Sequence, residues 1–223
     1  MAIEEQIAEL QHTLPPEVTL VAVSKTHPAE VILEAYRAGQ RIFGENRPQE
    51  LKAKYETLPK DIRWHMIGHL QTNKVKYIAP FVELIHSVDS DRLLEAIDRE
   101  AAKNNRVIDV LLEIHVATEE TKHGWEAAEL SDYIASGVYK KYTNVRFRGI
   151  MGIASFTDDR SLIRREFTRL RTSFEHLRDH YFGAEFDTLS MGMTSDYPLA
   201  VECGSTMVRI GSKIFGNRNY MNK

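Results

Sequence analysis

Eight short, largely apolar runs recur along the chain, and segments with helical signals separate them. The runs lie at residues 20–25, 41–45, 63–68, 84–89, 107–117, 147–155, 188–192 and 207–211. Near-continuous apolar strands that alternate with helices are typical of parallel sheets covered by helices. Eight such units favour a closed (β/α)8 barrel, the TIM-barrel fold of the α/β class, over an open sheet.

The length of the chain limits what else it can contain. At 223 residues it is shorter than the roughly 250 residues that are typical of such barrels, so its loops must be brief. We therefore predict a single domain over residues 1–223. The segment before the first strand, residues 1–14, is predicted to form an extra N-terminal helix packed on the outside of the barrel.

Composition excludes several classes of function. A net charge of −3 and a pI near 6.3 provide no general attraction to nucleic acid or to an anionic membrane. No uninterrupted apolar segment approaches the ~20 residues that a membrane helix needs. The single cysteine, Cys203, cannot form an internal disulfide, and the N-terminal segment lacks the pattern of a signal peptide. We expect a cytoplasmic protein whose partners are small ligands or other proteins.

Two glycine- and hydroxyl-rich turns follow the last two predicted strands. The first contains Ser190, Gly192, Thr194 and Ser195, and the second contains Gly211 and Ser212. In barrels of this kind the active site forms at the C-terminal ends of the strands, and the loops after strands 7 and 8 commonly hold phosphate. The two turns therefore predict a phosphorylated ligand.

Two basic residues narrow the identity of that ligand. Lys25 ends the first predicted strand, where desolvation would favour an uncharged amine able to attack a carbonyl. Arg209 lies inside the apolar run TMVRIG, and a buried guanidinium needs an acceptor such as an unprotonated ring nitrogen. A phosphate cradle, a Schiff-base lysine and a partner for a ring nitrogen together describe pyridoxal 5′-phosphate.

His65 and His69 are two histidines close enough in sequence to suggest a metal site. Their spacing of four residues directs two imidazoles at one ion only on a helix, whereas this segment is predicted to be a strand followed by a loop. We therefore expect no metal site from this pair, and no metal is among the predicted cofactors.

Five motifs strengthen the cofactor hypothesis. They read AVSKTHP, FGENRPQE, WHMIGHLQTNK, RGIMGI and LSMGMTSDYPLAVECGSTMVRIGSKIFG. They resemble the pyridoxal phosphate homeostasis protein family, also called the YggS, PROSC-like or proline synthase co-transcribed family, over nearly the whole chain. That family in turn is similar to the barrel domain of alanine racemase without the second domain of the racemase.

The resemblance implies a role for several residues. Lys25 matches the lysine that carries the cofactor, Arg209 the arginine that faces the pyridine nitrogen, and Asn46 a residue near the hydroxyl side of the ring. The implied phosphate binders are Ser190, Met191, Gly192, Thr194, Gly211 and Ser212. His69 departs from the pattern, because many members carry proline there.

The resemblance implies a monomeric carrier or regulator that maintains pyridoxal phosphate homeostasis without robust catalysis and hands the cofactor to apoenzymes. Two enzymatic alternatives stay open: an amino-acid racemase of narrow scope, and an aldolase that acts on a phosphorylated sugar through Lys25. Racemisation is disfavoured because an arginine-paired pyridine nitrogen makes the ring a weaker electron sink. In addition, no motif replaces the tyrosine that the racemase family takes from its second domain.

Overall fold

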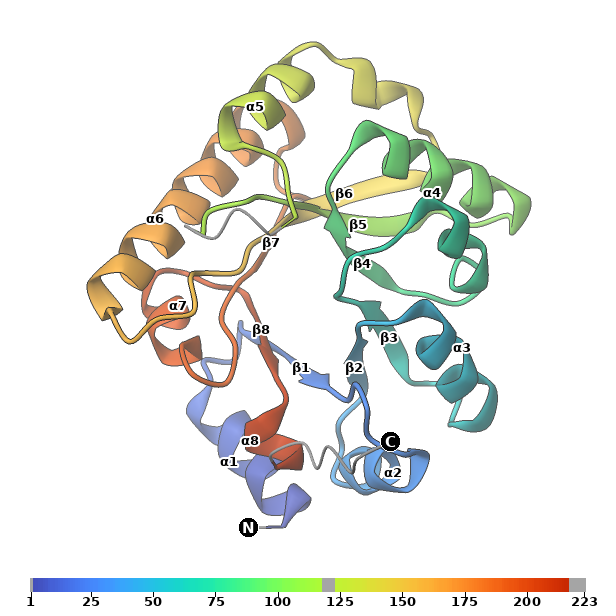
Figure 1. Ribbon diagram of the computed structural model, residues 1–223, viewed down its shortest axis with the longest axis vertical. Coiled ribbons are helices and arrows are strands. Elements are labelled where there is room, and N and C mark those ends of the chain that lie inside the picture. Colours follow the sequence, from blue (N-terminus) through green and yellow to red (C-terminus); the bar gives the residue numbers. More distant parts are fainter. Residues whose placement is uncertain (1, 118–122, 217–223) are drawn as a thin grey trace.

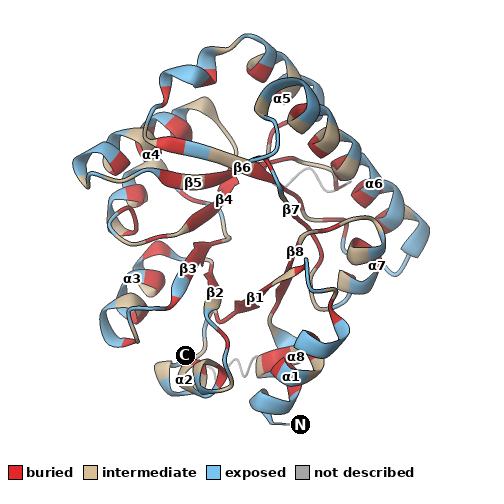
Figure 2. Ribbon diagram, turned by 180° about the vertical axis from the view of Figure 1, so that it is seen from behind, coloured by how far each residue is buried: buried red, intermediate tan, exposed pale blue. Residues whose placement is uncertain are grey.

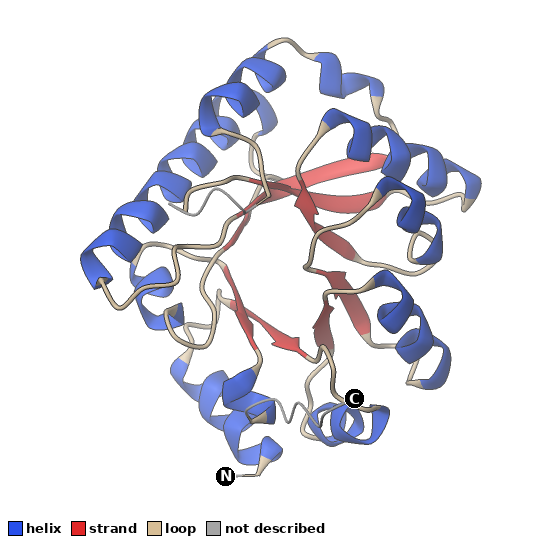
Figure 3. Ribbon diagram, in the orientation of Figure 1, coloured by secondary structure: helices blue, strands red, loops and turns tan. Residues whose placement is uncertain are grey.

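Eight parallel strands close into one barrel in the computed structural model, which describes residues 2–117 and 123–216. Each strand pairs with its neighbour in chain order, and β1 also pairs with β8, so the barrel has no open edge (Figure 3). The strands are β1 (Thr19–Val23), β2 (Ile42–Glu45), β3 (Arg63–Met66), β4 (Leu84–Val88), β5 (Ile108–Glu113), β6 (Val145–Met151), β7 (Thr188–Ser190) and β8 (Met207–Ile210). The predicted TIM barrel is confirmed.

Helices surround the barrel on its outside (Figure 1). The α-helices are α1 (Ile3–Thr13), α2 (Ala29–Arg37), α3 (Pro48–Thr57), α4 (Asp91–Lys103), α5 (Ala127–Ala135), α6 (Arg160–Leu177), α7 (Tyr197–Glu202) and α8 (Ser212–Phe215). Three other helical segments are the 3-10 helices η1 (Thr72–Tyr77) and η2 (Val138–Lys141) and the π-helical turn η3 (Arg178–Phe182). The connection between β3 and β4 is therefore a 3-10 helix, where the repeating pattern predicts an α-helix.

The N-terminal helix α1 is the predicted extra element. It packs against α2 and α8 on the outside of the barrel (Figure 1). Ile7 and Leu10 on its inner face are fully buried. None of the helices among the described residues combines the length and the apolar composition that a membrane-spanning segment requires.

Most of the hydrophobic core lies between the strands and the surrounding helices, and Figure 2 shows the buried residues concentrated on the strands and on the inner helix faces. A smaller cluster fills the inside of the barrel with Val21, Leu84, Leu111, Met151 and Met207. Residues paired in parallel register project to the same face of a sheet. The inside of the barrel therefore also receives polar residues that pair with this cluster.

The strand register places three polar residues inside the barrel. Arg209 pairs with Val21, His65 pairs with Leu84, and Glu113 pairs with Met151. All three are at least nine-tenths buried. Arg209 and Glu113 therefore make the barrel interior polar near the C-terminal ends of the strands, whereas His65 lines a cavity among residues that begin the strands.

Candidate functional site

A cavity of about 440 Å³ lies at the C-terminal ends of the strands. Most of the residues predicted from the sequence line it: Lys25, Asn46, Thr194, Arg209, Gly211 and Ser212. Ser195 also lines it, whereas Ser190, Met191 and Gly192 are buried and are not part of its wall. The structure thus brings together residues from β1, β2 and the last two strands.

Lys25 lies two residues beyond the end of β1, and carboxylates fix its neighbours on both sides. The hydroxyl of Ser24 donates to Glu45 Oε1 at 2.6 Å. The backbone N–H of Thr26 donates to Glu50 Oε1 at 2.6 Å, and Thr26 has φ of 70°, a conformation that non-glycine residues seldom adopt. The short segment that presents Lys25 to the cavity is therefore held in one conformation.

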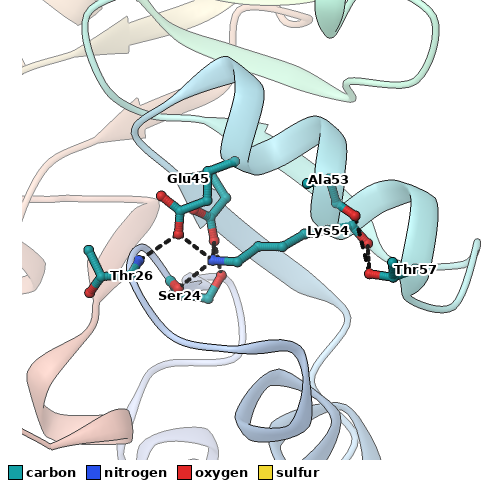
Figure 4. Close-up of polar contacts among 7 residues, drawn as sticks. Ser24, Thr26, Glu45, Ala53, Lys54 and Thr57 are labelled. Atoms are coloured by element: carbon teal, nitrogen blue, oxygen red, sulfur yellow. Dashed lines mark hydrogen bonds and ion pairs between the residues drawn. The ribbon is translucent and has the colours of Figure 1, made fainter.

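Lys54 of α3 joins these contacts into one buried network (Figure 4). Its Nζ donates to the carbonyl of Ser24 at 2.9 Å and to the carboxylates of Glu45 and Glu50 at 2.7 Å each. Burial raises the pKa of the Glu45 carboxyl, and the charge of Lys54 opposes that rise. Because Lys54 bonds to both carboxylates and to the Ser24 carbonyl, the network anchors α3 to the loop that carries Lys25.

Arg209 lines the cavity and is almost fully buried. Nη1 donates to Ser190 Oγ at 2.6 Å, and Nη2 donates to the carbonyl of Gly152 at 3.0 Å. Burial lowers the pKa of Arg209 to about 10, so the group remains charged at neutral pH. A guanidinium has five N–H donors. The bonds to Ser190 and Gly152 use two of them and orient the plane of the group.

Two buried histidines extend the support of Arg209 into the barrel. Ser190 Oγ lies 3.1 Å from His86 Nδ1, and His86 Nε2 lies 3.0 Å from His65 Nδ1. Burial lowers the pKa of both imidazoles, so both are neutral at pH 7. The tautomer of His86 sets the direction of both bonds: with its proton on Nε2, His86 accepts from Ser190 at Nδ1 and donates to His65 Nδ1.

The two glycine- and hydroxyl-rich turns meet at one corner of the cavity. The backbone N–H of Gly211 donates to Thr194 Oγ1 at 3.3 Å, and the N–H of Arg209 donates to the carbonyl of Gly192 at 2.9 Å. Gly192 has φ of +94°, and a Cβ there would lie 2.6 Å from the Cβ of Ala200. The turn after β7 therefore depends on glycine for both its conformation and its close packing on α7.

Asn46, which follows β2, contributes an acceptor to the wall of the cavity. Its Oδ1 is buried and has no hydrogen-bond partner in the described part of the chain. Gly68 packs so closely on this residue that a Cβ at Gly68 would lie 2.7 Å from the Asn46 carbonyl oxygen. An unpaired buried acceptor is costly, so a ligand that donates to Asn46 would satisfy the site.

Glu113 is a residue of this site that the sequence analysis missed. Its side chain lines a second cavity of about 230 Å³ that shares Asn46, Ile67 and Ile153 with the first. Its Oε2 is buried without a hydrogen-bond partner among the described residues, and burial raises its pKa to about 7. The sequence signal for this residue is a glutamate within the apolar run VLLEI, because a charged residue in a buried strand indicates a site just as the arginine in TMVRIG does.

Comparison with known proteins assigns the chain to a family. The model of the alanine racemase N-terminal domain matches residues 1–219. The pyridoxal phosphate homeostasis protein of Aquifex aeolicus is 44% identical over 90% of this chain and 87% of its own. That of Escherichia coli K12 is 38% identical over 94% of this chain and 89% of its own. The chain belongs to the pyridoxal phosphate homeostasis protein family. The resemblance seen in the five motifs is thereby confirmed.

Solved structures agree with this membership in the pyridoxal phosphate homeostasis protein family. PipY of Synechococcus elongatus is 40% identical, and its structures without and with pyridoxal phosphate bound give TM-scores of 0.90 and 0.86 over 96% of this chain and all of PipY. The alanine racemase of Bartonella henselae is only 15% identical, with a TM-score of 0.69, and so shares the fold alone. The match covers 97% of this chain but 60% of that racemase.

Proposed function

We propose that this protein binds pyridoxal 5′-phosphate in the larger cavity and serves the homeostasis of that cofactor, acting in the cytoplasm as a monomer without robust catalysis. The observation that carries the proposal is the convergence of Lys25 and Arg209 on one cavity of about 440 Å³ beside two turns rich in glycine and hydroxyl groups. The structure with bound pyridoxal phosphate of the relative PipY supports the choice of ligand.

The residues of the cavity fit this ligand by their chemistry. Lys25 supplies the amine that would bond to the aldehyde carbon, and Thr194, Ser195, Gly211 and Ser212 provide hydroxyl and backbone N–H groups for a phosphate. The charged Arg209 would donate to the ring nitrogen of the bound cofactor without protonating it. Asn46 Oδ1 would accept from the ring hydroxyl, which would satisfy its buried oxygen.

The same residues favour storage or transfer of the cofactor over turnover. When bound, pyridoxal phosphate supplies an electron sink, and that sink is weak while the pyridine nitrogen is unprotonated. Arg209 would keep it so, because its pKa of about 10 leaves it a donor throughout the physiological range. About two fifths of the Bartonella henselae racemase lies outside the match. By family resemblance, the second proton donor of racemases comes from that part.

Absorption spectroscopy with borohydride reduction tests the proposal. Added pyridoxal phosphate should give a visible band that borohydride abolishes, and mass analysis should find a pyridoxyl group on Lys25. The Lys25→Ala variant should show neither. If the wild-type chain stayed colourless and unmodified with added cofactor, the cofactor proposal would fail. Trapping of a sugar phosphate on Lys25 would then identify an aldolase.

The racemase alternative needs its own measurement. Single enantiomers of amino acids are incubated with the cofactor-loaded protein, and the chirality is followed over time. We expect no sustained isomerisation. Steady conversion that disappears in Lys25→Ala would show that the protein is a racemase of narrow scope.

A further inference from the structure

Two histidines and an aspartate meet on the rim of the barrel. They are His69 after β3, Asp89 after β4, and His123 in the connection between β5 and α5. One ligand atom from each lies within 4.8 Å of the other two. His69 Nδ1 is 3.2 Å from Asp89 Oδ2, and the rings of His69 and His123 stack with centroids 3.8 Å apart.

The backbone that carries His69 is fixed from two sides. Ser87 Oγ donates to the carbonyl of the preceding residue, Gly68, at 2.6 Å. Gly68 also packs against the backbone of Asn46, leaving no room for a side chain. His69 therefore leaves the end of β3 in a defined direction.

Asp89 is oriented by its neighbour in the chain. Ser90 is the N-cap of α4, where its Oγ accepts from the N–H of Leu93 at 3.3 Å. The same hydroxyl donates to Asp89 Oδ1 at 3.1 Å. Oδ1 is thus occupied by Ser90, and Oδ2 is the oxygen that faces His69.

His123 lies two residues before Trp125, whose backbone and indole are both anchored. Trp125 forms a bridge with Ile114: its N–H donates to the Glu113 carbonyl at 2.8 Å, and its carbonyl accepts from the His115 N–H at 3.0 Å. The indole Nε1 of Trp125 donates to the Val88 carbonyl at 3.1 Å. Trp125 therefore holds the backbone next to His123 close to the ends of β4 and β5.

We propose that His69, Asp89 and His123 bind a divalent transition-metal ion of the zinc class. Imidazole and carboxylate are ligands that Zn²⁺ prefers, and two ligand atoms about 2.0–2.1 Å from a tetrahedral ion lie about 3.3 Å apart. The 3.2 Å between His69 Nδ1 and Asp89 Oδ2 matches that separation. His123 completes the set by rotating its exposed ring from the stack toward the ion.

Three protein ligands leave the fourth position of a tetrahedral ion open. His69 and His123 line the smaller cavity together with Glu113, and that cavity shares Asn46 with the larger one. The open position is thus available to water or to a small oxygen ligand at the rim. This inference does not depend on the cofactor proposal, because none of the three metal ligands lines the larger cavity.

Metal binding by a second histidine pair must be distinguished from binding at this site. His176 and His180 are exposed, lie four residues apart at the end of α6 and in η3, and have ring centroids 4.5 Å apart. Two histidines at i and i+4 on a helix can share one metal ion. The double variant His176→Ala/His180→Ala is therefore the matched control.

Isothermal titration of the full chain with Zn²⁺ tests the proposal. The wild-type protein and the His176→Ala/His180→Ala variant should bind one ion with the same affinity, and His69→Ala and His123→Ala should each weaken that binding by about tenfold or more. Asp89→Asn, which keeps the shape of the side chain, should also weaken it. Absence of binding, or binding lost only in the control variant, would overturn the proposal.

A Co²⁺ spectrum gives a second readout that does not rely on affinity. Co²⁺ in the wild-type site should show the intense visible bands of tetrahedral coordination, and Asp89→Asn should change them. Weak octahedral bands that are identical in wild type and Asp89→Asn would contradict a site built on Asp89.

Discussion

Arg209 Nη1 donates to Ser190 Oγ at 2.6 Å across the interface of β8 and β7, beneath the cavity. By family resemblance Ser190 is a phosphate binder, yet its side chain is fully buried and its hydroxyl bonds to Arg209 and His86. We interpret Ser190 as a positioning residue that fixes the guanidinium, and this interpretation can be tested.

Ser190→Ala should destabilise the fold and loosen Arg209. The substitution removes a buried partner from both a guanidinium and an imidazole, which costs about 1–3 kcal/mol or more for the charged group. Urea unfolding measures the loss, and the affinity and absorption spectrum of added pyridoxal phosphate report the position of Arg209.

Ser205→Ala is the matched control for that variant. Ser205 is buried in the same corner, but its hydroxyl contacts only backbone carbonyls, with Met191 O at 2.8 Å the shortest contact. It should lower stability by about 1 kcal/mol and leave the cofactor spectrum unchanged. Equal spectra for the two variants would reject the positioning role of Ser190.

Lys54→Met should be far more destabilising than Lys52→Met on the same helix. Removing one partner of a buried ion pair costs about 3–5 kcal/mol, because the buried Glu45 carboxyl and the Ser24 carbonyl both lose the donor that Lys54 supplies. Lys52 pairs with Glu56 at 3.6 Å on the exposed face, where such pairs are worth about 0–1 kcal/mol. Comparable urea midpoints for the two variants would show that the buried network does not hold α3 in place.

Glu113→Gln should become increasingly stabilising, relative to wild type, as pH rises. Burial raises the pKa of Glu113 from 4.5 to about 7. Between those values the folded state holds a proton that the unfolded state has released, so the wild-type free energy of unfolding falls as pH rises. Glutamine does not titrate, so the variant lacks this pH-dependent loss of stability, which reaches roughly 3 kcal/mol above pH 7 in the wild type.

Urea unfolding of wild type and Glu113→Gln at pH 4.5 and pH 8 measures the difference. Glu45, His65 and His86 titrate in both proteins, so their contributions cancel in the comparison. A difference in unfolding free energy that does not change with pH would show that Glu113 is not buried in its protonated form near neutrality.

Gly192→Ala should disturb the turn after β7 more than Gly39→Ala disturbs the end of α2. Both glycines have φ of +94°, so both substitutions carry about 1–2 kcal/mol of backbone strain. Nothing lies within 4 Å of a Cβ at Gly39, whereas at Gly192 it would collide with Ala200 and add about 1–3 kcal/mol of overpacking. Thermal unfolding and pyridoxal phosphate affinity should both fall further in Gly192→Ala; equal losses would contradict the packing argument.

Periodicity in the sequence determined the fold of this protein. Eight apolar runs separated by helical segments are sufficient to predict the barrel, because parallel strands buried on both faces need an apolar residue at nearly every position. Because the strands are parallel, the closed barrel places all their C-terminal ends on one face. Lys25, Asn46 and Arg209 could therefore be predicted to share a cavity. A charged residue inside an apolar run was the most informative local signal.

Only the tertiary structure decided which polar groups meet. The contact between Ser190 and His86 joins residues 104 positions apart, and Lys54 reaches back 30 residues to Ser24. Strand register and the twist of the closed barrel set these distances, and neither leaves a periodic trace in the sequence. His69 and Asp89 likewise become neighbours because β3 and β4 end side by side, which a spacing rule within one segment does not detect.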